Sequence, residues 1–175
     1  MNHSHPHHGH PQHGSVQMEV NMEKIKEQIK SLKSENSTMI LATKAANDHA
    51  EISYAPYIYF NHKYYIIVAQ IGTHYNNITQ RKAFQGMIIE SEQSAVNTFF
   101  RKRMIFNFMY EKINNEEEII EQFVSKHGQL VKQTLMMDFN IFELKMVNGR
   151  VILGPGQAFR LDENESIVSH VTSKE

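Results

Sequence analysis

Histidine is the residue type through which this sequence could bind a metal. The chain has 11 histidines and no cysteine among its 175 residues, so thiolate ligands, disulfides and cysteine nucleophiles are excluded. Iron or zinc would have to be held by His, Tyr, Asp or Glu. Six histidines lie within residues 1–15, where closely spaced imidazoles bind nickel, copper or zinc in a native tail and in an expression tag alike. We therefore assign no function to this segment.

The triplet Arg101-Lys102-Arg103 is the best local source of positive charge. Alternate residues of a strand point to opposite faces, so Arg101 and Arg103 would share a face and could act together on an anionic group. Motifs for several other chemistries are missing: the sequence has no Gly-x-Ser-x-Gly elbow, His-Glu-x-x-His helix or phosphate loop. It also has no nicotinamide or flavin fingerprint, so a redox reaction would need electrons from an external donor.

Composition predicts one compact domain with a tail. Hydrophobic residues make up 41% of the chain and charged residues 21%, which is ordinary for a globular protein. The 18 basic and 19 acidic residues nearly balance, which argues against a nucleic-acid partner. No run of about 18 apolar residues and no signal peptide is present, so we expect no membrane insertion and a cytoplasmic location.

Hydrophobic periodicity predicts the elements that would position these residues. Apolar residues spaced by three and four indicate an amphipathic helix over 18–33, and a second helical pattern over 116–135 is interrupted at His127-Gly128. The polar stretch 72–85 predicts one or two helical turns. Pro56 marks part of its strand as an edge or a bulge. Strands are predicted at 38–46, 51–61, 63–70, 86–92, 101–112, 138–147 and 150–161.

The last two predicted strands flank Asn148-Gly149, which is a strong signal for a tight hairpin. The Gly154-Pro155-Gly156 triplet then interrupts the second strand, where backbone would approach a ligand or another subunit, or turn a barrel corner. Residues 162–175 form a predicted polar tail that contains His170.

Six or seven short strands, two or three helices and no alternating βαβ pattern favour a small antiparallel barrel. A barrel of this size closes with little internal space, so a ligand would bind outside it or between subunits. A band of tyrosines could supply such a surface, although aromatic residues at this density more often pack a core or a dimer contact. These tyrosines are Tyr54, Tyr57, Tyr59, Tyr64 and Tyr65.

Four segments together resemble the heme-utilisation HutZ/HugZ family, whose members are relatives of the pyridoxamine-phosphate oxidases. They are the SYAP, FFRKRMIF, DF and GPGQA segments, and the similarity covers about residues 36–161. The resemblance implies a mainly β protein with flanking helices (α+β), a homodimeric split β-barrel of the FMN-binding-protein type. It also implies heme bound between subunits and oxidative cleavage of heme to a biliverdin-type product, with release of iron.

The same resemblance suggests roles for individual residues. His170 lies where the family has its axial heme ligand, and Asp138 is a candidate partner for the other ring nitrogen of that histidine. Arg101 and Arg103 are candidates for the heme propionates. The family usually has an arginine before the histidine of the loop after the third strand. This chain has Thr73 before His74, so oxygen activation would depend on water or on His74.

Composition predicts a disordered His-rich tail at 1–17 and a C-terminal tail at 162–175. The resemblance adds a split-barrel domain at 18–161 and places the candidate heme ligand in the C-terminal tail. Two alternatives remain open. One is an FMN-binding oxidoreductase of the pyridoxamine-phosphate oxidase type. The lack of Lys or Arg in residues 71–79, where a flavin phosphate would need a cation, argues against it, although Arg81 and Lys82 follow. The other is a non-catalytic heme storage or transfer protein.

Overall fold

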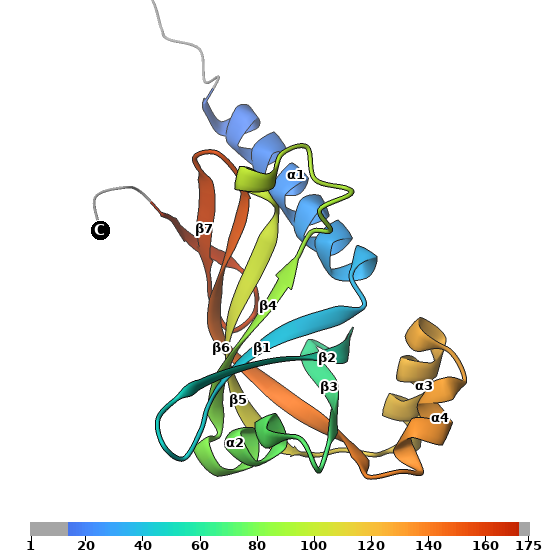
Figure 1. Cartoon of the computed structure of the whole chain (residues 1–175). Helices are drawn as coiled ribbons and strands as arrows, with labels where there is room; N and C mark the ends of the chain where they lie inside the picture. Colours follow the sequence, from blue (N-terminus) through green and yellow to red (C-terminus); the bar gives the residue numbers. More distant parts are fainter. Residues whose placement is uncertain (1–13, 172–175) are drawn as a thin grey trace, which may run out of the picture.

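The computed structural model describes residues 14–171 (Figure 1). Most of the predicted histidine-rich tail lies outside the described residues. The helices are α1 (Gly14–Glu35), α2 (Thr73–Arg81), α3 (Glu117–His127) and α4 (Leu130–Leu135), with a 3-10 turn η1 (Thr98–Phe100). The strands are β1 (Thr38–Lys44), β2 (Ala50–Phe60), β3 (Lys63–Ala69), β4 (Ala83–Ile89), β5 (Arg103–Ile113), β6 (Phe139–Gly154), β7 (Gln157–Leu161) and β8 (Ile167–His170).

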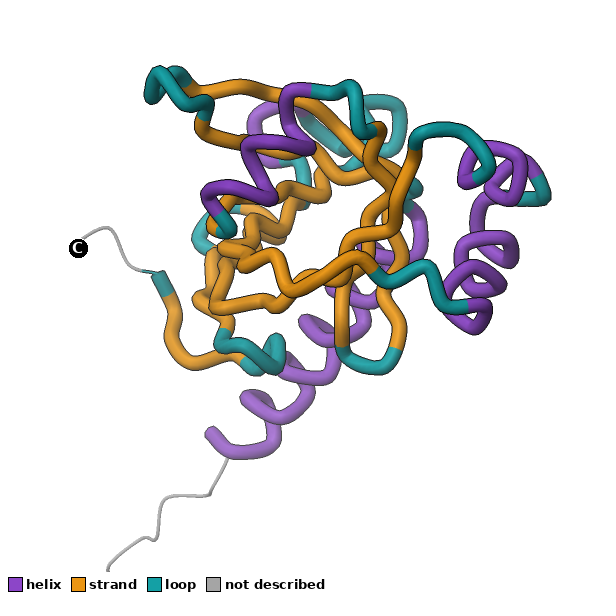
Figure 2. Tube along the Cα trace, turned by 90° about the horizontal axis from the view of Figure 1, so that it is seen from below, coloured by secondary structure: helices purple, strands orange, loops and turns teal. Residues whose placement is uncertain are grey.

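Six strands close into an antiparallel barrel. They follow the order β3-β2-β1-β4-β5-β6, and pairing of β3 with β6 completes the ring. The long strand β6 continues past the barrel, where β7 and then β8 pair beyond it. Helices α3 and α4 stand together outside the ring of strands, as Figure 2 shows. The predicted small antiparallel barrel with flanking helices is confirmed.

The barrel interior is filled by aromatic and aliphatic side chains. The ring of Tyr64 lies 4.8 Å from that of Phe106 and 5.4 Å from that of Phe108, measured between centroids. Strand β3 is buried on both faces, because Tyr64 and Ile66 point into the barrel while Tyr65 and Ile67 pack against α3 and α4. Most of the tyrosine band is therefore core. Tyr54 is the exception, since 66% of it is exposed.

Pro56 lies where β2 changes partner. Residues 50–56 pair with β1, and residues 57–60 pair with β3. Proline has no N–H to donate, so it fits a position that lacks a partner on one side. The predicted edge position of Pro56 is confirmed.

The predicted break in the second helix is also confirmed. Helix α3 ends at His127, and Gly128 follows with a φ of 90°, in the region that glycine adopts most readily. Helix α4 then returns along the same side of the barrel. None of the helices in residues 14–171 is both long enough and apolar enough to span a membrane.

The hairpin prediction at Asn148-Gly149 is wrong, because both residues lie inside β6. Gly149 does not have a positive φ, and a Cβ at this position would lie 2.6 Å from the carbonyl oxygen of Ile105. The glycine thus permits close approach of β5 at a bulge. The turn is at Pro155-Gly156, where Gly156 has a φ of 67°. Proline followed by glycine is the preferred pair of a type II turn.

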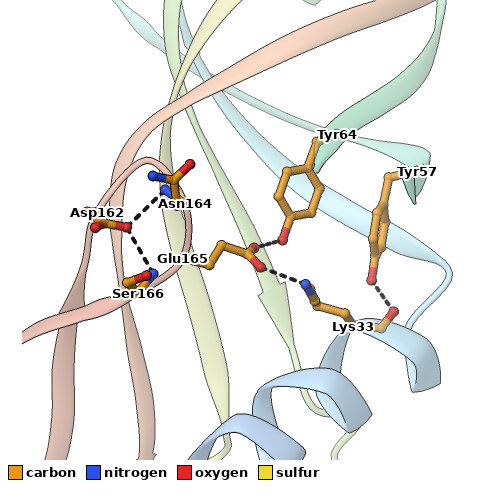
Figure 3. Close-up of polar contacts among 7 residues, drawn as sticks. All are labelled: Lys33, Tyr57, Tyr64, Asp162, Asn164, Glu165 and Ser166. Carbon is orange, nitrogen blue, oxygen red and sulfur yellow. Dashed lines mark hydrogen bonds and ion pairs between the residues drawn. The ribbon is translucent and has the colours of Figure 1, made fainter. Parts of the chain in front are cut away.

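The segment after Leu161 was expected to be a polar tail, and the structure differs. The carboxylate of Asp162 accepts hydrogen bonds from the N–H groups of Asn164 and Ser166, both at 2.9 Å. This turn reverses the chain (Figure 3), and β8 then pairs with β7. His170 therefore lies on a strand, opposite Phe159 of β7.

Candidate functional site

The structure divides the five predicted site residues between two ends of the barrel. His170 of β8 is the register partner of Phe159 in β7, which is opposite Val151 of β6, which in turn is opposite Met104 of β5. Arg103 directly precedes Met104, so the two arginines lie at the far side of this row of strands. At about 4.8 Å per strand, this row is roughly 15 Å wide. His74 and Asp138 lie at the opposite end.

His170 is exposed, and its ring contacts two neighbours. Its Nε2 lies 2.6 Å from the carbonyl oxygen of Gly156, and its ring centroid lies 5.1 Å from that of Phe159. A carbonyl oxygen can only accept a hydrogen bond, so Nε2 is the donor in this contact. In the neutral ring with this tautomer, Nδ1 is the nitrogen that could bind a metal. Among the described residues, no three His, Asp or Glu side chains come together as a metal site.

A groove of about 620 Å³ lies between α1 and the β7–β8 pair, with His170 in its wall. Its apolar lining comes from both sides and includes Met22, Ile25, Phe159 and Ile167, and Lys24 contributes a cation. Predominantly apolar lining with few polar groups is typical of a cofactor or small-molecule site of this size. The groove can accept a flat apolar ligand, with an imidazole on one side and a charged group at the rim.

A buried polar cluster joins the two walls of this groove (Figure 3). The ammonium of Lys33 in α1 lies 2.6 Å from a carboxylate oxygen of Glu165, which precedes β8, and the hydroxyl of Tyr64 donates to the other oxygen. Tyr57 donates to the carbonyl oxygen of Lys33. Burial, followed by the nearby Glu165 charge, raises the pKa of Tyr64 well above its usual value. Tyr64 therefore stays a donor.

Sequence reasoning missed this clamp, which we define as Lys33, Tyr64 and Glu165. Glu165 is separated from Lys33 by 132 positions and from Tyr64 by 101. No periodicity or local motif links residues this far apart. The expectation of a polar tail also hid Glu165, which is only 11% exposed.

Arg101 and Arg103 were expected to share one face of a strand, and the guanidinium of Arg103 donates to the carbonyl oxygen of Arg101 at 3.1 Å. Arg101 precedes β5, its Nε donates to the carbonyl oxygen of Glu90 at 2.8 Å, and its Nη1 lies 3.3 Å from Glu92. Arg103 begins β5 and alternates with the buried Met104, so its side chain is on the outward face. His170 lies on the other face, with Phe159. Within one chain, neither arginine faces the groove.

His74 lies in the first turn of α2 and is half-buried. Burial lowers its pKa, and the charge of Glu51 opposes this shift only in part. The helix is held to the barrel by Asn77, whose Nδ2 lies 2.8 Å from Glu51 and 3.1 Å from Thr43. This environment favours the neutral imidazole.

Asp138 is exposed and directly precedes β6. Its carbonyl oxygen accepts a hydrogen bond from the N–H of Gln70 at 2.8 Å, which places it near the start of α2 and at the same end as His74. Thirteen positions of β6 separate Asp138 from Val151, and these span roughly 40 Å of strand. Asp138 therefore does not reach His170 of the same chain, and the carbonyl oxygen of Gly156 takes the expected position beside the ring.

Comparisons with known proteins agree with this fold. No family model matches the chain. The heme oxygenase HutZ of Vibrio cholerae is 26% identical over 149 residues, which cover 82% of this chain and 85% of the relative. The crystal structure of V. cholerae HutZ carries the description heme storage protein. Its alignment with this chain has a TM-score of 0.67 at 26% identity and covers 74% of this chain and 94% of HutZ.

The crystal structure of ChuZ from Campylobacter jejuni gives a TM-score of 0.77 at 25% identity over 85% of this chain. The chain spans only 63% of the length of ChuZ. A protein of the pyridoxamine 5'-phosphate oxidase type from Listeria innocua shares the fold, with a TM-score of 0.54 at 9% identity over 73% of this chain and 97% of that one. These findings confirm the resemblance that the sequence motifs indicated: the chain is similar to HutZ and ChuZ and has a split-barrel fold.

Proposed function

We propose that this protein binds heme in the groove beside His170 and degrades it oxidatively to a biliverdin-type product. Iron would be released, and O2 and electrons from an external reductant would be consumed, in the cytoplasm. The observation that carries the proposal is the imidazole of His170 in the wall of an apolar groove, with Nε2–H donated to Gly156. The relatives with the names heme oxygenase and heme storage protein support the choice of ligand.

The groove suits this role through its own residues. The Gly156 carbonyl oxygen, 2.6 Å from Nε2, orients the ring of His170, and the ring of Phe159 lies beside it at 5.1 Å between centroids. Apolar side chains on α1 and β7 would exclude water from the ligand face, and Lys24 would lie near an anionic edge. When bound, heme supplies the iron that binds O2 and the porphyrin ring that is cleaved.

The remaining candidate residues would require a second subunit. Asp138, Arg103 and His74 do not face the groove of their own chain, so a homodimer is needed if they are to contact heme. Exposed apolar residues support the dimer, since Ile52 and Tyr54 on β2 are 80% and 66% exposed. In this arrangement Asp138 would replace the Gly156 carbonyl oxygen as the acceptor of the Nε2–H of the histidine of the other subunit. Arg103 would pair with a propionate, and His74 would lie near the oxygen side. Arg101, which is held by Glu90, would position the start of β5.

A heme titration tests this proposal. Heme is added to the full chain and to a variant whose six tail histidines are replaced by asparagine, and the Soret band is followed. We expect a stoichiometric complex in both proteins, loss of the complex in His170→Ala, and no loss in the exposed control His49→Ala. An unchanged spectrum and affinity in His170→Ala would contradict the assignment of the ligand.

The alternative of a non-catalytic heme storage protein is favoured by the description of the solved HutZ structure. Ascorbate added to the complex in air separates the two. Loss of the Soret band with formation of a bilin supports the oxygenase, and a stable band supports storage. If no heme complex forms, the heme proposal is wrong, and FMN is the next ligand to titrate.

A further inference from the structure

We propose that a second groove, between the C-terminal part of α1 and α3, binds the phosphate group of a phosphorylated small molecule. The groove has a volume of about 650 Å³ and contains three lysines, Lys30 and Lys33 from α1 and Lys126 from α3. It lies apart from His170, so the inference does not depend on heme binding. The remaining lining residues are Ser34, Ile58, Tyr59, Gln122 and Ser125.

The charge in this groove is balanced only in part by acidic side chains. Lys33 is paired with Glu165, but in residues 14–171 no carboxylate lies within ion-pair distance of Lys30 or Lys126. The ammonium of Lys126 lies 3.8 Å from the ring centroid of Tyr57 and 3.4 Å from the carbonyl oxygen of Lys33. Burial lowers the pKa of Lys126 to about 8. A bound anion would restore the stability of its charged form.

The residue types favour a phosphate over a planar carboxylate. Lysine binds phosphate as a point charge, whereas bidentate recognition of carboxylates is the property of arginine, which is not among the lining residues. The hydroxyl of Ser125 adds a donor, whereas that of Ser34 already donates to the carbonyl oxygen of Ser31 at 3.1 Å. The buried Ile58 and the ring of Tyr59 add apolar surface to the lining, and the ammonium of Lys33 lies 3.6 Å from the centroid of that ring. A groove this size therefore suits a phosphate attached to a small apolar or aromatic body.

Phenyl phosphate is the probe, with benzoate as the carboxylate comparison, and binding to the full chain is measured by calorimetry. We expect saturable binding of phenyl phosphate that is stronger than binding of benzoate. Lys126→Met keeps the aliphatic stem over Tyr57 and should weaken binding about tenfold or more, since a hydrogen bond to a charged group is lost. Lys132→Met removes the same charge from an exposed pair with Glu121 and should leave binding unchanged.

A second measurement does not depend on variants. Reductive methylation at neutral pH, read by mass spectrometry, should modify Lys126 in the free protein and should be suppressed at saturating phenyl phosphate, whereas modification of Lys132 should not change. Equal weakening in both variants, or stronger binding of benzoate, would overturn the proposal. Failure of phenyl phosphate to saturate the protein or to protect Lys126 would overturn it as well.

Discussion

Removal of the Glu165 carboxylate should destabilise the protein strongly. Glu165→Ala would leave the ammonium of Lys33, which is 14% exposed, without the partner now 2.6 Å away. It would also remove the acceptor of the buried Tyr64 hydroxyl. Breaking a buried ion pair from one side costs about 3–5 kcal/mol. Because Lys33 keeps some contact with water, we expect a loss at the lower end, about 3 kcal/mol of unfolding free energy, or roughly 6–12 °C in Tm.

Urea denaturation measures this change, and two further variants separate its cause. Glu163→Ala removes a carboxylate from an exposed position of the same turn and should change the unfolding free energy by less than about 0.5 kcal/mol. In Lys33→Met/Glu165→Ala no buried charge is left unpaired, so the double variant should be more stable than the sum of the single changes predicts. Additive losses, or a Glu165→Ala protein as stable as the wild type, would refute the clamp.

Three other predictions follow from particular contacts. Gly149→Ala should lower the unfolding free energy by about 1–3 kcal/mol, since the added Cβ would lie 2.6 Å from the Ile105 carbonyl oxygen. Gly154→Ala is the control, because its Cβ would meet nothing closer than 3.8 Å. In the same urea assay it should change the unfolding free energy little. Burial lowers the pKa of His127 in the folded protein below 6.5. The stability that the neutral ring contributes is therefore present above pH 6.5 and is lost as the pH falls through the pKa of the folded state. The unfolding free energy should differ less between pH 7 and pH 5 in His127→Gln than in the wild type. Asp138→Asn should leave stability within about 0.5 kcal/mol, because the residue is exposed, and should slow heme turnover if its carboxylate serves the other subunit; unchanged turnover would contradict that role.

Local signals predicted most elements but misplaced one turn. The strands before residue 70 and the break at Gly128 depend on residue types and neighbours, so periodicity and glycine position were sufficient. Asn148-Gly149 carries the same kind of local signal, yet β6 runs straight through it. The reason is non-local: β5 pairs along this part of β6, and the glycine is needed where Ile105 approaches. The type II turn at Pro155-Gly156 then reverses the chain.

The candidate site divides in the same way. The resemblance indicated His170 as a candidate ligand, and the structure places it in a groove with its Nε2 on Gly156. Within one chain His170 and Asp138 lie far apart, because His170 is aligned through Phe159 with Val151 near the end of β6, whereas Asp138 directly precedes the start of that strand. Sequence distance alone, 32 residues, gave no indication of this separation, since it does not report the path of an extended strand.

The sequence by itself determined the type and order of most elements, the lack of thiol chemistry and the resemblance to the HutZ/HugZ proteins, because these depend on composition, short-range periodicity and motif order. Only the tertiary structure decided which charged residues meet. Lys33, Tyr64 and Glu165 come from α1, β3 and the turn before β8, and closure of the barrel brings them together. A buried ion pair depends on packing that excludes water from both partners, and that packing is a property of the whole fold.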